Sequence, residues 1–264
     1  MLFCYSQLIF VAGDSMTEFT IGIAGRYVRI RAIYEYAREF CQNYLTEGEP
    51  DFTVEIAPSD IEFEREKAAR EDLYEGREVF DYQSDYLETL AIYRKIVEKM
   101  LDYDTFLFHG SAICVDGEGY LFTAKSGTGK STHTSLWKKI FRHHFQYVND
   151  DKPLLWVKED QIIVCGTPWD GKHRLSTNIM VPLKGLVILE RGEKNEITSV
   201  EPDAVFPLLL QQSYRPNDPV AVTKTLKLLQ KTMRIVRIFR LKCTISGQAV
   251  FVAYKGINGK DYEI

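Results

Sequence analysis

A short polar segment with an evident chemical use spans residues 126–132, where the sequence is S-G-T-G-K-S-T. Glycines allow backbone conformations that other residues avoid, so several main-chain N–H groups can turn toward one point. These groups and the positive end of a following helix form a cradle for phosphate oxygens. Within it, Lys130 would contact the β- and γ-phosphates of a nucleotide, and the Ser131 hydroxyl would bind Mg²⁺. The expected cofactor-binding residues are Ser126, Gly127, Thr128, Gly129, Lys130, Ser131 and Thr132.

The segment departs in one place from the pattern G-x-x-x-x-G-K-[ST], because Ala124 stands where the first glycine is expected. Alanine resists positive φ, which leaves room for a loop geometry that differs slightly from the common one. The alternative interpretation is a Gly-Ser-Thr turn with an incidental lysine. An apolar run before the segment and an amphipathic run after it favour the phosphate loop.

Two adjacent carboxylates, Asp150 and Asp151, follow the next apolar run. Nucleotide enzymes need an acidic group near the phosphate loop, at the end of a strand, to hold Mg²⁺ or to accept a proton. Adjacent carboxylates repel each other, and a cation between them and a phosphate would relieve that repulsion. The alternative is a solvated Asp-Asp turn before Pro153.

Basic and imidazole side chains supply further candidates. His109 ends the apolar run before the predicted hairpin, where a lone histidine more often packs or caps than reacts. The Gly- and Pro-containing segment G-T-P-W-D-G-K-H-R, residues 166–174, ends in Lys172, His173 and Arg174. These side chains could clamp a transferring phosphoryl group, or they could be exposed surface.

The elements that must position these residues follow from the apolar patterns. Residues 19–32 and 51–57 predict strands on either side of a helix at 33–45, and the charged stretch 60–83 predicts a solvated strand-loop segment rather than a linker. Ser84 is the expected N-cap of a helix whose apolar face comprises Leu87, Leu90, Tyr93, Ile96, Val97 and Met100. Later predictions are a hairpin around residues 116–119, a helix at 130–141, a strand at 145–148, a hairpin at 154–166, a strand at 183–190, helices near 203 and after 218, a strand at 237–241 and a short helix after 246.

Composition limits the classes of protein and partner. The 264 residues are 45% hydrophobic and 27% charged, which is typical of a globular chain. A net charge of −4 argues against nucleic acid as the main partner. The apolar start, residues 1–13, is interrupted by polar residues and is typical of a buried strand rather than a signal peptide. No apolar run reaches the roughly 18 residues of a membrane span, and five scattered cysteines favour reduced thiols in a cytoplasmic protein.

The order His109-Gly110, an apolar hairpin, S-G-T-G-K-S-T and then N-D-D resembles the catalytic domain of HPr kinase/phosphorylase. It is also similar to the nucleotide-binding core of ATP-dependent phosphoenolpyruvate carboxykinase. The resemblance covers about residues 106–168. It implies an α/β fold: a phosphoenolpyruvate-carboxykinase-like core, a mixed sheet with a P-loop, plus a smaller N-terminal α+β portion. We predict an N-terminal α+β region at residues 1–83 and a P-loop kinase-like catalytic domain at residues 84–264.

The resemblance also implies roles. Lys130 contacts phosphates, Ser131 and Asp151 lie at Mg²⁺, and Asp150 is the general base, although the two aspartates could exchange roles. His109 would lie beside this pair, and Lys172 or Arg174 would stabilise charge on the transferred group. The HPr-docking signature is missing after the acidic pair, where W-D-G-K-H-R-L-S-T-N stands instead.

The predicted function is transfer of the γ-phosphoryl group of ATP, with Mg²⁺, to a hydroxyl of a peptide, protein or small metabolite. Two alternatives stay open: a nucleotide-sensing module that binds ATP without turnover, and a peptide-binding scaffold with a vestigial phosphate site. Neither nucleic acid nor a membrane is an expected partner, and the family resemblance is compatible with a homo-oligomer.

Overall fold

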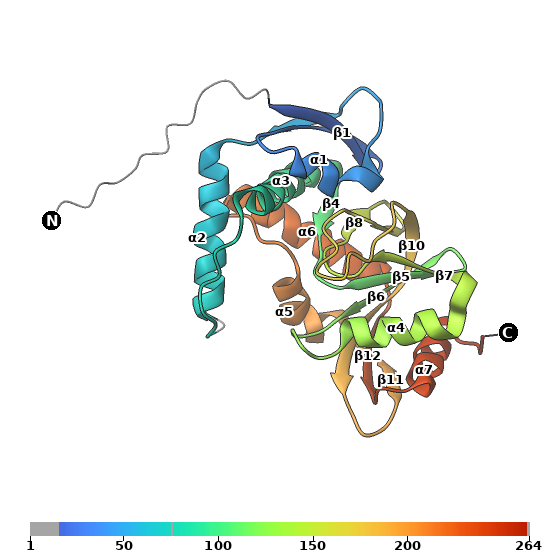
Figure 1. Cartoon of the computed structure of the whole chain (residues 1–264). Helices are drawn as coiled ribbons and strands as arrows, with labels where there is room; N and C mark the ends of the chain where they lie inside the picture. Colours follow the sequence, from blue (N-terminus) through green and yellow to red (C-terminus); the bar gives the residue numbers. More distant parts are fainter. Residues whose placement is uncertain (1–15, 75, 263–264) are drawn as a thin grey trace.

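The computed structural model describes residues 16–74 and 76–262 of the chain. Figure 1 shows a small sheet with its helices above a larger, curled mixed sheet that helices flank. The mixed α/β class predicted from the sequence is therefore confirmed. The predicted strand within residues 1–13, like Cys4, lies outside the described residues.

The N-terminal part is built on a three-stranded sheet in the order β1-β2-β3, comprising β1 (Thr17–Ile23), β2 (Arg26–Ala32) and β3 (Phe52–Glu55). β1 and β2 form an antiparallel hairpin, and β3 joins β2 in parallel. The predicted helix between these strands is a short α1 (Tyr36–Phe40) followed by a 3-10 turn. The apolar face of α3 (Ser84–Met100) packs into the same core cluster as this sheet. Its residues include Leu87, Ile96 and Met100, so the predicted apolar face is confirmed.

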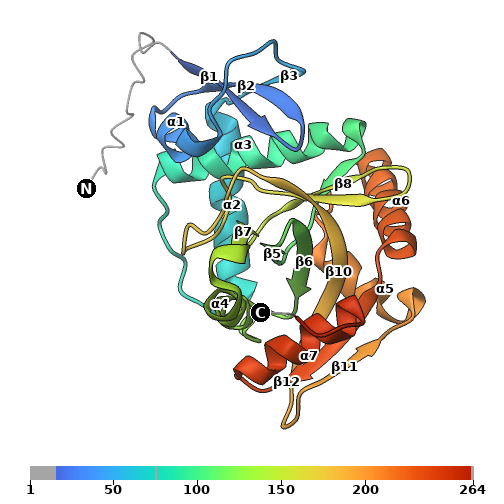
Figure 2. The same ribbon diagram turned by 90° about the vertical axis from the view of Figure 1, so that its right-hand side faces the viewer.

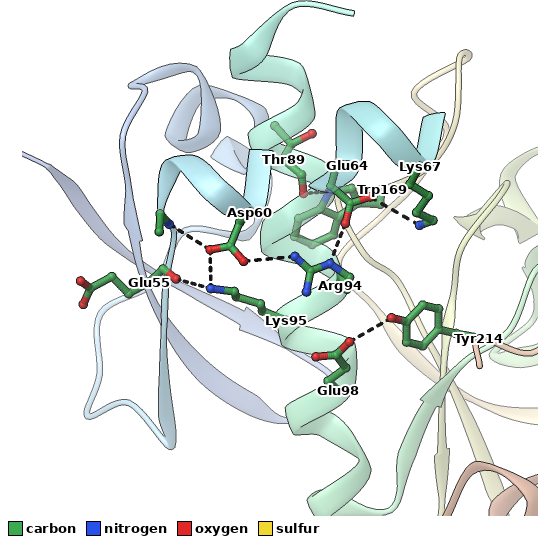
Figure 3. A network of polar contacts seen from close by, with 11 residues as sticks. Glu55, Asp60, Glu64, Lys67, Thr89, Arg94, Lys95, Glu98, Trp169 and Tyr214 are labelled. Carbon is green, nitrogen blue, oxygen red and sulfur yellow. Dashed lines mark hydrogen bonds and ion pairs between the residues drawn. The ribbon is translucent and has the colours of Figure 1, made fainter. Parts of the chain in front are cut away.

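The charged stretch at residues 60–83 contradicts the prediction of a strand-loop segment, because α2 (Pro58–Tyr74) fills most of it. Its Glu, Arg, Lys and Ala residues are strong helix formers, and no apolar stripe is needed where ion pairs hold the helix. Figure 3 shows these pairs: Arg94 of α3 contacts Glu64 at 2.6 Å and Asp60 at 3.2 Å. Lys95 contacts Asp60 at 2.6 Å. The N-cap prediction was one residue late, because α3 begins at Ser84 after Gln83.

The larger sheet has the strand order β4-β8-β9-β10-β6-β5-β7, with β12 beside β10 and β11 beside β12. Its strands are β4 (Thr105–Leu107), β5 (Ser111–Val115), β6 (Glu118–Thr123), β7 (Phe145–Asn149), β8 (Leu154–Val157), β9 (Ile162–Cys165), β10 (Met180–Arg191), β11 (Glu196–Ser199) and β12 (Ile238–Cys243). The long strand β10 explains the curl. Its first residues pair with β9 in antiparallel fashion, and its later residues pair with β12 in parallel.

Helices cover both faces of this sheet (Figure 2). One face packs against α5 (Pro202–Gln212) and α6 (Pro219–Ile235), and the other packs against α4 (Lys130–Phe141) and α7 (Gly247–Asn258). Neighbouring residues of a strand face opposite clusters, as Ala112 and Ile113 do in β5. Burial on both sides explains why these strands are continuous apolar runs in the sequence.

The remaining element predictions hold with small shifts at the ends. The helix at 130–141 has the predicted bounds, and both predicted hairpins form. Asp218 caps α6 by accepting a hydrogen bond from the Ala221 N–H at 2.7 Å, and Ser246 caps α7. Among the described residues, none of the helices is long and apolar enough to cross a membrane. The predicted boundary after residue 83 stays a prediction.

Candidate active site

The glycine-rich loop connects β6 to α4 and begins directly after the buried end of β6. Gly127 and Gly129 have φ values of +74° and +115°, in the left-handed region that disfavours side chains. No atom lies within 4 Å of the Cβ that Gly127 would carry, so backbone conformation rather than space requires glycine there. Ala124 is buried and does not have positive φ, so alanine at this position costs the loop nothing in backbone strain.

Lys130 begins α4 and turns its ammonium group back toward the start of the loop, where it donates to the Ala124 carbonyl at 3.2 Å. Burial lowers the pKa of Lys130 below its ordinary 10.5, although the charges of Asp151 and Asp150 act to raise it. Lys130, Asp150 and Asp151 also line one cavity. The loop lysine and the acidic pair face the same space.

Asn149 shapes the turn that carries the acidic pair. Its side-chain oxygen accepts hydrogen bonds from the N–H groups of Asp151 at 2.9 Å and Lys152 at 2.6 Å. Its side-chain nitrogen donates to the carbonyl and hydroxyl oxygens of Thr167, at 3.0 and 2.9 Å. Because Asn149 is fully buried, these hydrogen bonds fix the backbone of the turn from its buried side.

Asp150 points inward and is only 7% exposed. One of its oxygens accepts a hydrogen bond from the hydroxyl of Ser111, a residue with no exposed surface. Ser111 also contacts the Thr134 hydroxyl at 3.2 Å, and Thr134 in turn bonds the carbonyl of Lys130. A buried hydroxyl chain thus ties Asp150 to the first turn of α4.

Asp151 lies at the surface of the same turn. Its carboxylate is 3.3 Å from the His109 ring nitrogen Nε2 and 3.7 Å from the Lys152 ammonium group. Burial raises the pKa of Asp151, but the hydrogen bond from His109 and the charges of Lys152 and Lys130 outweigh burial and hold it below its ordinary 3.8. Asp151 therefore keeps its negative charge.

A cavity of about 580 Å³, which we call the phosphate cavity, brings most of the predicted residues together. Its lining includes His109, Ser126, Gly127, Gly129, Lys130, Ser131, Thr132, Asp150, Asp151, Asp170, Gly171, Lys172 and His173. Two predicted residues are elsewhere. Thr128 lines a separate hollow of about 370 Å³ on the other side of the loop, with the ends of β10 and β12. Arg174 is the second.

Arg174 anchors the segment 166–174 and does not line the phosphate cavity. Its guanidinium group donates to the carbonyls of Pro168 at 3.0 Å and Phe40 at 3.1 Å, and lies 4.1 Å from the centre of the Phe40 ring. It also pairs with Asp170 at 3.2 Å. These contacts bind the segment to α1, whereas Lys172 and His173 reach the cavity.

Sequence reasoning missed three residues of this site. Ser111 and Asn149 act through buried hydrogen bonds that only the fold brings about, although Asn149 stands in the N-D-D run itself. Asp170 was overlooked because only the basic residues of its segment were considered. It is 4% exposed, and burial raises its pKa above the ordinary 3.8. Its Oδ1 atom accepts no hydrogen bond from the described residues, although Arg174 lies close.

The donor set fits Mg²⁺ completed by a substrate's phosphates. Within residues 16–74 and 76–262, no group of three or more His, Cys, Asp and Glu side chains is arranged to hold an ion alone. Mg²⁺ in nucleotide sites usually takes one or two carboxylates, and its other ligands are phosphate oxygens and waters. The hydroxyl of Ser131 and the carboxylates of Asp150 and Asp151 all line the phosphate cavity.

Among solved structures, the chain is similar to the Hpr(Ser) kinase/phosphatase from Coxiella burnetii, with a TM-score of 0.34 and 12% sequence identity. The match covers 58% of this chain and 95% of that one. No family model matches the chain, and no curated protein matches it in sequence. The function is therefore inferred from the residues of this chain.

Proposed function

We propose that this protein is an ATP- and Mg²⁺-dependent kinase that transfers the γ-phosphoryl group to a hydroxyl. The observation that carries the proposal is the phosphate cavity, in which the glycine-rich loop and Lys130 face Asp150 and Asp151. A phosphate-binding loop alone would serve many nucleotide proteins. A loop that shares its cavity with two carboxylates, one buried and one charged, also has the groups that phosphoryl transfer requires.

The nucleotide lies across the glycine-rich loop. Its phosphates accept hydrogen bonds from the loop N–H groups and from the Lys130 ammonium group. In the absence of a nucleotide, that ammonium group donates to the Ala124 carbonyl. Its nucleoside occupies the hollow of about 370 Å³ beyond the loop, which is walled by Leu136, Leu189 and Ile245 among others. Gly127, Gly129 and Thr132 line both this hollow and the phosphate cavity, so one ligand can occupy the two spaces.

Transfer is an in-line exchange at the γ-phosphorus. The acceptor oxygen forms a bond to phosphorus while the bond to the β–γ bridging oxygen breaks, and ADP leaves with that electron pair. Asp150 accepts the hydroxyl proton, and Ser111 holds its carboxylate in place. Lys172, at the rim of the cavity, faces the charge that develops on the transferred group. Mg²⁺ bound by Ser131 and Asp151 would neutralise phosphate charge.

Nucleotide titration with and without Mg²⁺, combined with an assay of ATP consumption, tests the proposal. We expect Lys130→Ala to weaken ATP binding about tenfold or more, because the phosphates lose their contact with the ammonium group. Lys139→Ala, an exposed lysine of the same helix, is the matched control and should bind ATP normally. Asp150→Asn should bind ATP but transfer no phosphate.

Three results would contradict the proposal. Wild-type protein that binds no nucleotide would exclude it, as would Lys130→Ala protein with unchanged affinity. Wild-type protein that binds ATP without consuming it, in the presence of candidate hydroxyl acceptors analysed by mass spectrometry, would indicate the nucleotide-sensing module instead.

A further inference from the structure

A hollow of about 510 Å³, which we call the aromatic hollow, lies beside the phosphate cavity. Residues of α1, of α3 and of the segment 166–174 line it, together with Asp151 and Lys152. Its volume is in the range of pockets that hold small molecules. Asp151, Asp170, Gly171 and Lys172 line both spaces, so a ligand in the aromatic hollow touches a wall of the phosphate cavity.

Two rings of the aromatic hollow are held in place by the fold. The Trp169 ring is 3% exposed, stacks on Tyr93 at 4.1 Å between ring centres and donates to the Thr89 carbonyl at 2.8 Å. The Phe40 ring lies 5.9 Å from that of Trp169, and the Arg174 guanidinium group is 4.1 Å from its centre. A wall that is fixed before a ligand arrives loses little conformational entropy on binding.

Two further rings are open to a ligand. Tyr36 and Tyr86, which both line the aromatic hollow, are 38% and 37% exposed. A tyrosine ring offers an apolar face to C–H groups, and its hydroxyl can donate or accept a hydrogen bond. The hollow therefore suits a ligand that has an apolar face and hydrogen-bonding groups at its edge.

The charges on the walls balance one another. Three carboxylates and three cations line the aromatic hollow: Glu39, Asp151, Asp170, Lys152, Lys172 and Arg174. Because the two signs are equal in number, a ligand with a strong net charge of either sign would meet like charges there. A neutral ligand avoids that repulsion.

Polar groups without partners indicate which hydrogen bonds a ligand would make. Within residues 16–74 and 76–262, no side chain pairs with the Glu39 carboxylate or the Lys172 ammonium group. Asp170 is 4% exposed, and no hydrogen bond reaches its Oδ1 atom from the part of the chain that the structure describes, although Arg174 lies 3.2 Å away. Carboxylates need donors and an ammonium group needs acceptors. An alcohol hydroxyl supplies both.

We propose that the aromatic hollow is a binding site for a neutral, polyhydroxylated ring, such as a sugar or a cyclic polyol. The C–H face of the ring packs on Tyr36 and Tyr86. Its hydroxyls donate to the carboxylates of Glu39 and Asp170 and accept from the Lys172 ammonium group. The site goes beyond the proposed kinase function and does not depend on it.

Saturation-transfer NMR on the full chain tests the site with glucose, ribose and inositol as probes. Benzoate and benzylamine are the comparison ligands, because each has a ring and one charge but no hydroxyl. Wild-type protein should transfer saturation to the C–H protons of at least one polyol, and it should bind both comparison ligands several-fold more weakly.

Variants of the walls test the assigned contacts. Tyr36→Ala/Tyr86→Ala should weaken polyol binding about tenfold, and Tyr86→Phe, which keeps the ring, should change it little. Glu39→Ala removes an acceptor and should weaken binding about fivefold. Phe251→Ala is the matched control, because Phe251 is 42% exposed on α7 and does not line the hollow. Thermal unfolding of each variant separates lost binding from lost folding.

Three results would overturn the site: no binding of any polyol, tighter binding of benzoate or benzylamine, or unchanged polyol binding by the folded double variant. Polyol binding by a protein that binds no nucleotide would support the site and remove the kinase proposal alone. Phosphorylation of the bound polyol after addition of ATP and Mg²⁺ would support both and would identify the ring as the hydroxyl acceptor.

Discussion

Asp150 and Asp151 are neighbours in sequence but lie in different surroundings. Asp150 is buried and accepts from a neutral hydroxyl, whereas Asp151 is bonded to His109 and lies near two ammonium groups. The turn held by Asn149 produces this difference, because it sends one carboxylate inward and the other outward. Two carboxylates in unlike environments can take separate roles, such as proton acceptor and metal ligand.

The contact between His109 and Asp151 should be visible in the pH dependence of stability. Since the pKa of Asp151 is lower in the folded state than its ordinary 3.8, its ionisation stabilises the folded protein above pH about 4. That stabilisation is lost as the pH falls through the lowered pKa. His109→Ala removes the hydrogen bond and should raise the pKa. The variant should therefore be less stable than wild type near neutral pH, and the difference should shrink in acid.

Urea unfolding at a series of pH values measures this effect. His144→Ala is the control, because His144 pairs with the exposed Asp116 at the surface, where such pairs contribute little. If the stability difference for His109→Ala stays constant from neutral pH down to pH about 3, the contact with His109 does not lower the pKa of Asp151.

The pair of helices α2 and α3 depends on a few polar contacts rather than on an apolar stripe (Figure 3). Glu64 is 2% exposed, and Arg94 is its closest cation. Arg94→Ala leaves that carboxylate buried with only the partly exposed Lys67, at 3.4 Å, as a partner. We therefore expect a loss of about 3–5 kcal/mol in the free energy of unfolding, measured by urea titration.

Arg70→Ala is the matched control on α2. Arg70 pairs with Glu66 where both side chains are more than 60% exposed, so its loss should cost about 1 kcal/mol or less. Equal effects of the two substitutions would show that burial of Glu64 does not govern the packing of α2.

The elements that sequence reasoning placed correctly are those that a local pattern defines. The helix at 130–141 follows a glycine loop and has a clear apolar face, and Asp218 with Pro219 marks the start of α6. α2 was missed because its sequence lacks an apolar stripe, and its stabilising partners lie on α3, at residues 94 and 95. Contacts between residues so far apart in the chain leave no recognisable pattern within either segment of the sequence.

The residues of the candidate site also divide into those that a local pattern reveals and those that only the fold brings together. Residue types and spacing singled out the glycine-rich loop, the acidic pair and His109, and all of them except Thr128 line one cavity. The buried surroundings of Asp150 include Ser111, which is 39 positions from Asp150 in the chain. Arg174 was expected at the phosphates, but the fold uses it to fix the segment 166–174 to α1.

At the scale of the whole molecule, the N-terminal elements and α3 help to position the candidate site. Trp169 stacks on Tyr93 of α3 at 4.1 Å between ring centres and donates to the Thr89 carbonyl at 2.8 Å. The same segment carries Asp170 and Lys172 into the phosphate cavity. The aromatic hollow, of about 510 Å³ beside the phosphate cavity, is therefore lined both by N-terminal residues, such as Tyr36 and Phe40, and by residues of the segment 166–174.

The strand β10 has hydrogen-bonded neighbours on both edges at residues 186–188, where β12 lies on one side and β6 on the other, and residues 186–189 lie in the buried cores on both faces of the sheet. Amides so enclosed reach solvent only when the sheet itself comes apart. In deuterated water, the amides of Val187 and Ile188 should therefore be among the last to lose their protons, long after those of α2. The exchange rate of these two amides would therefore report how often the whole protein unfolds.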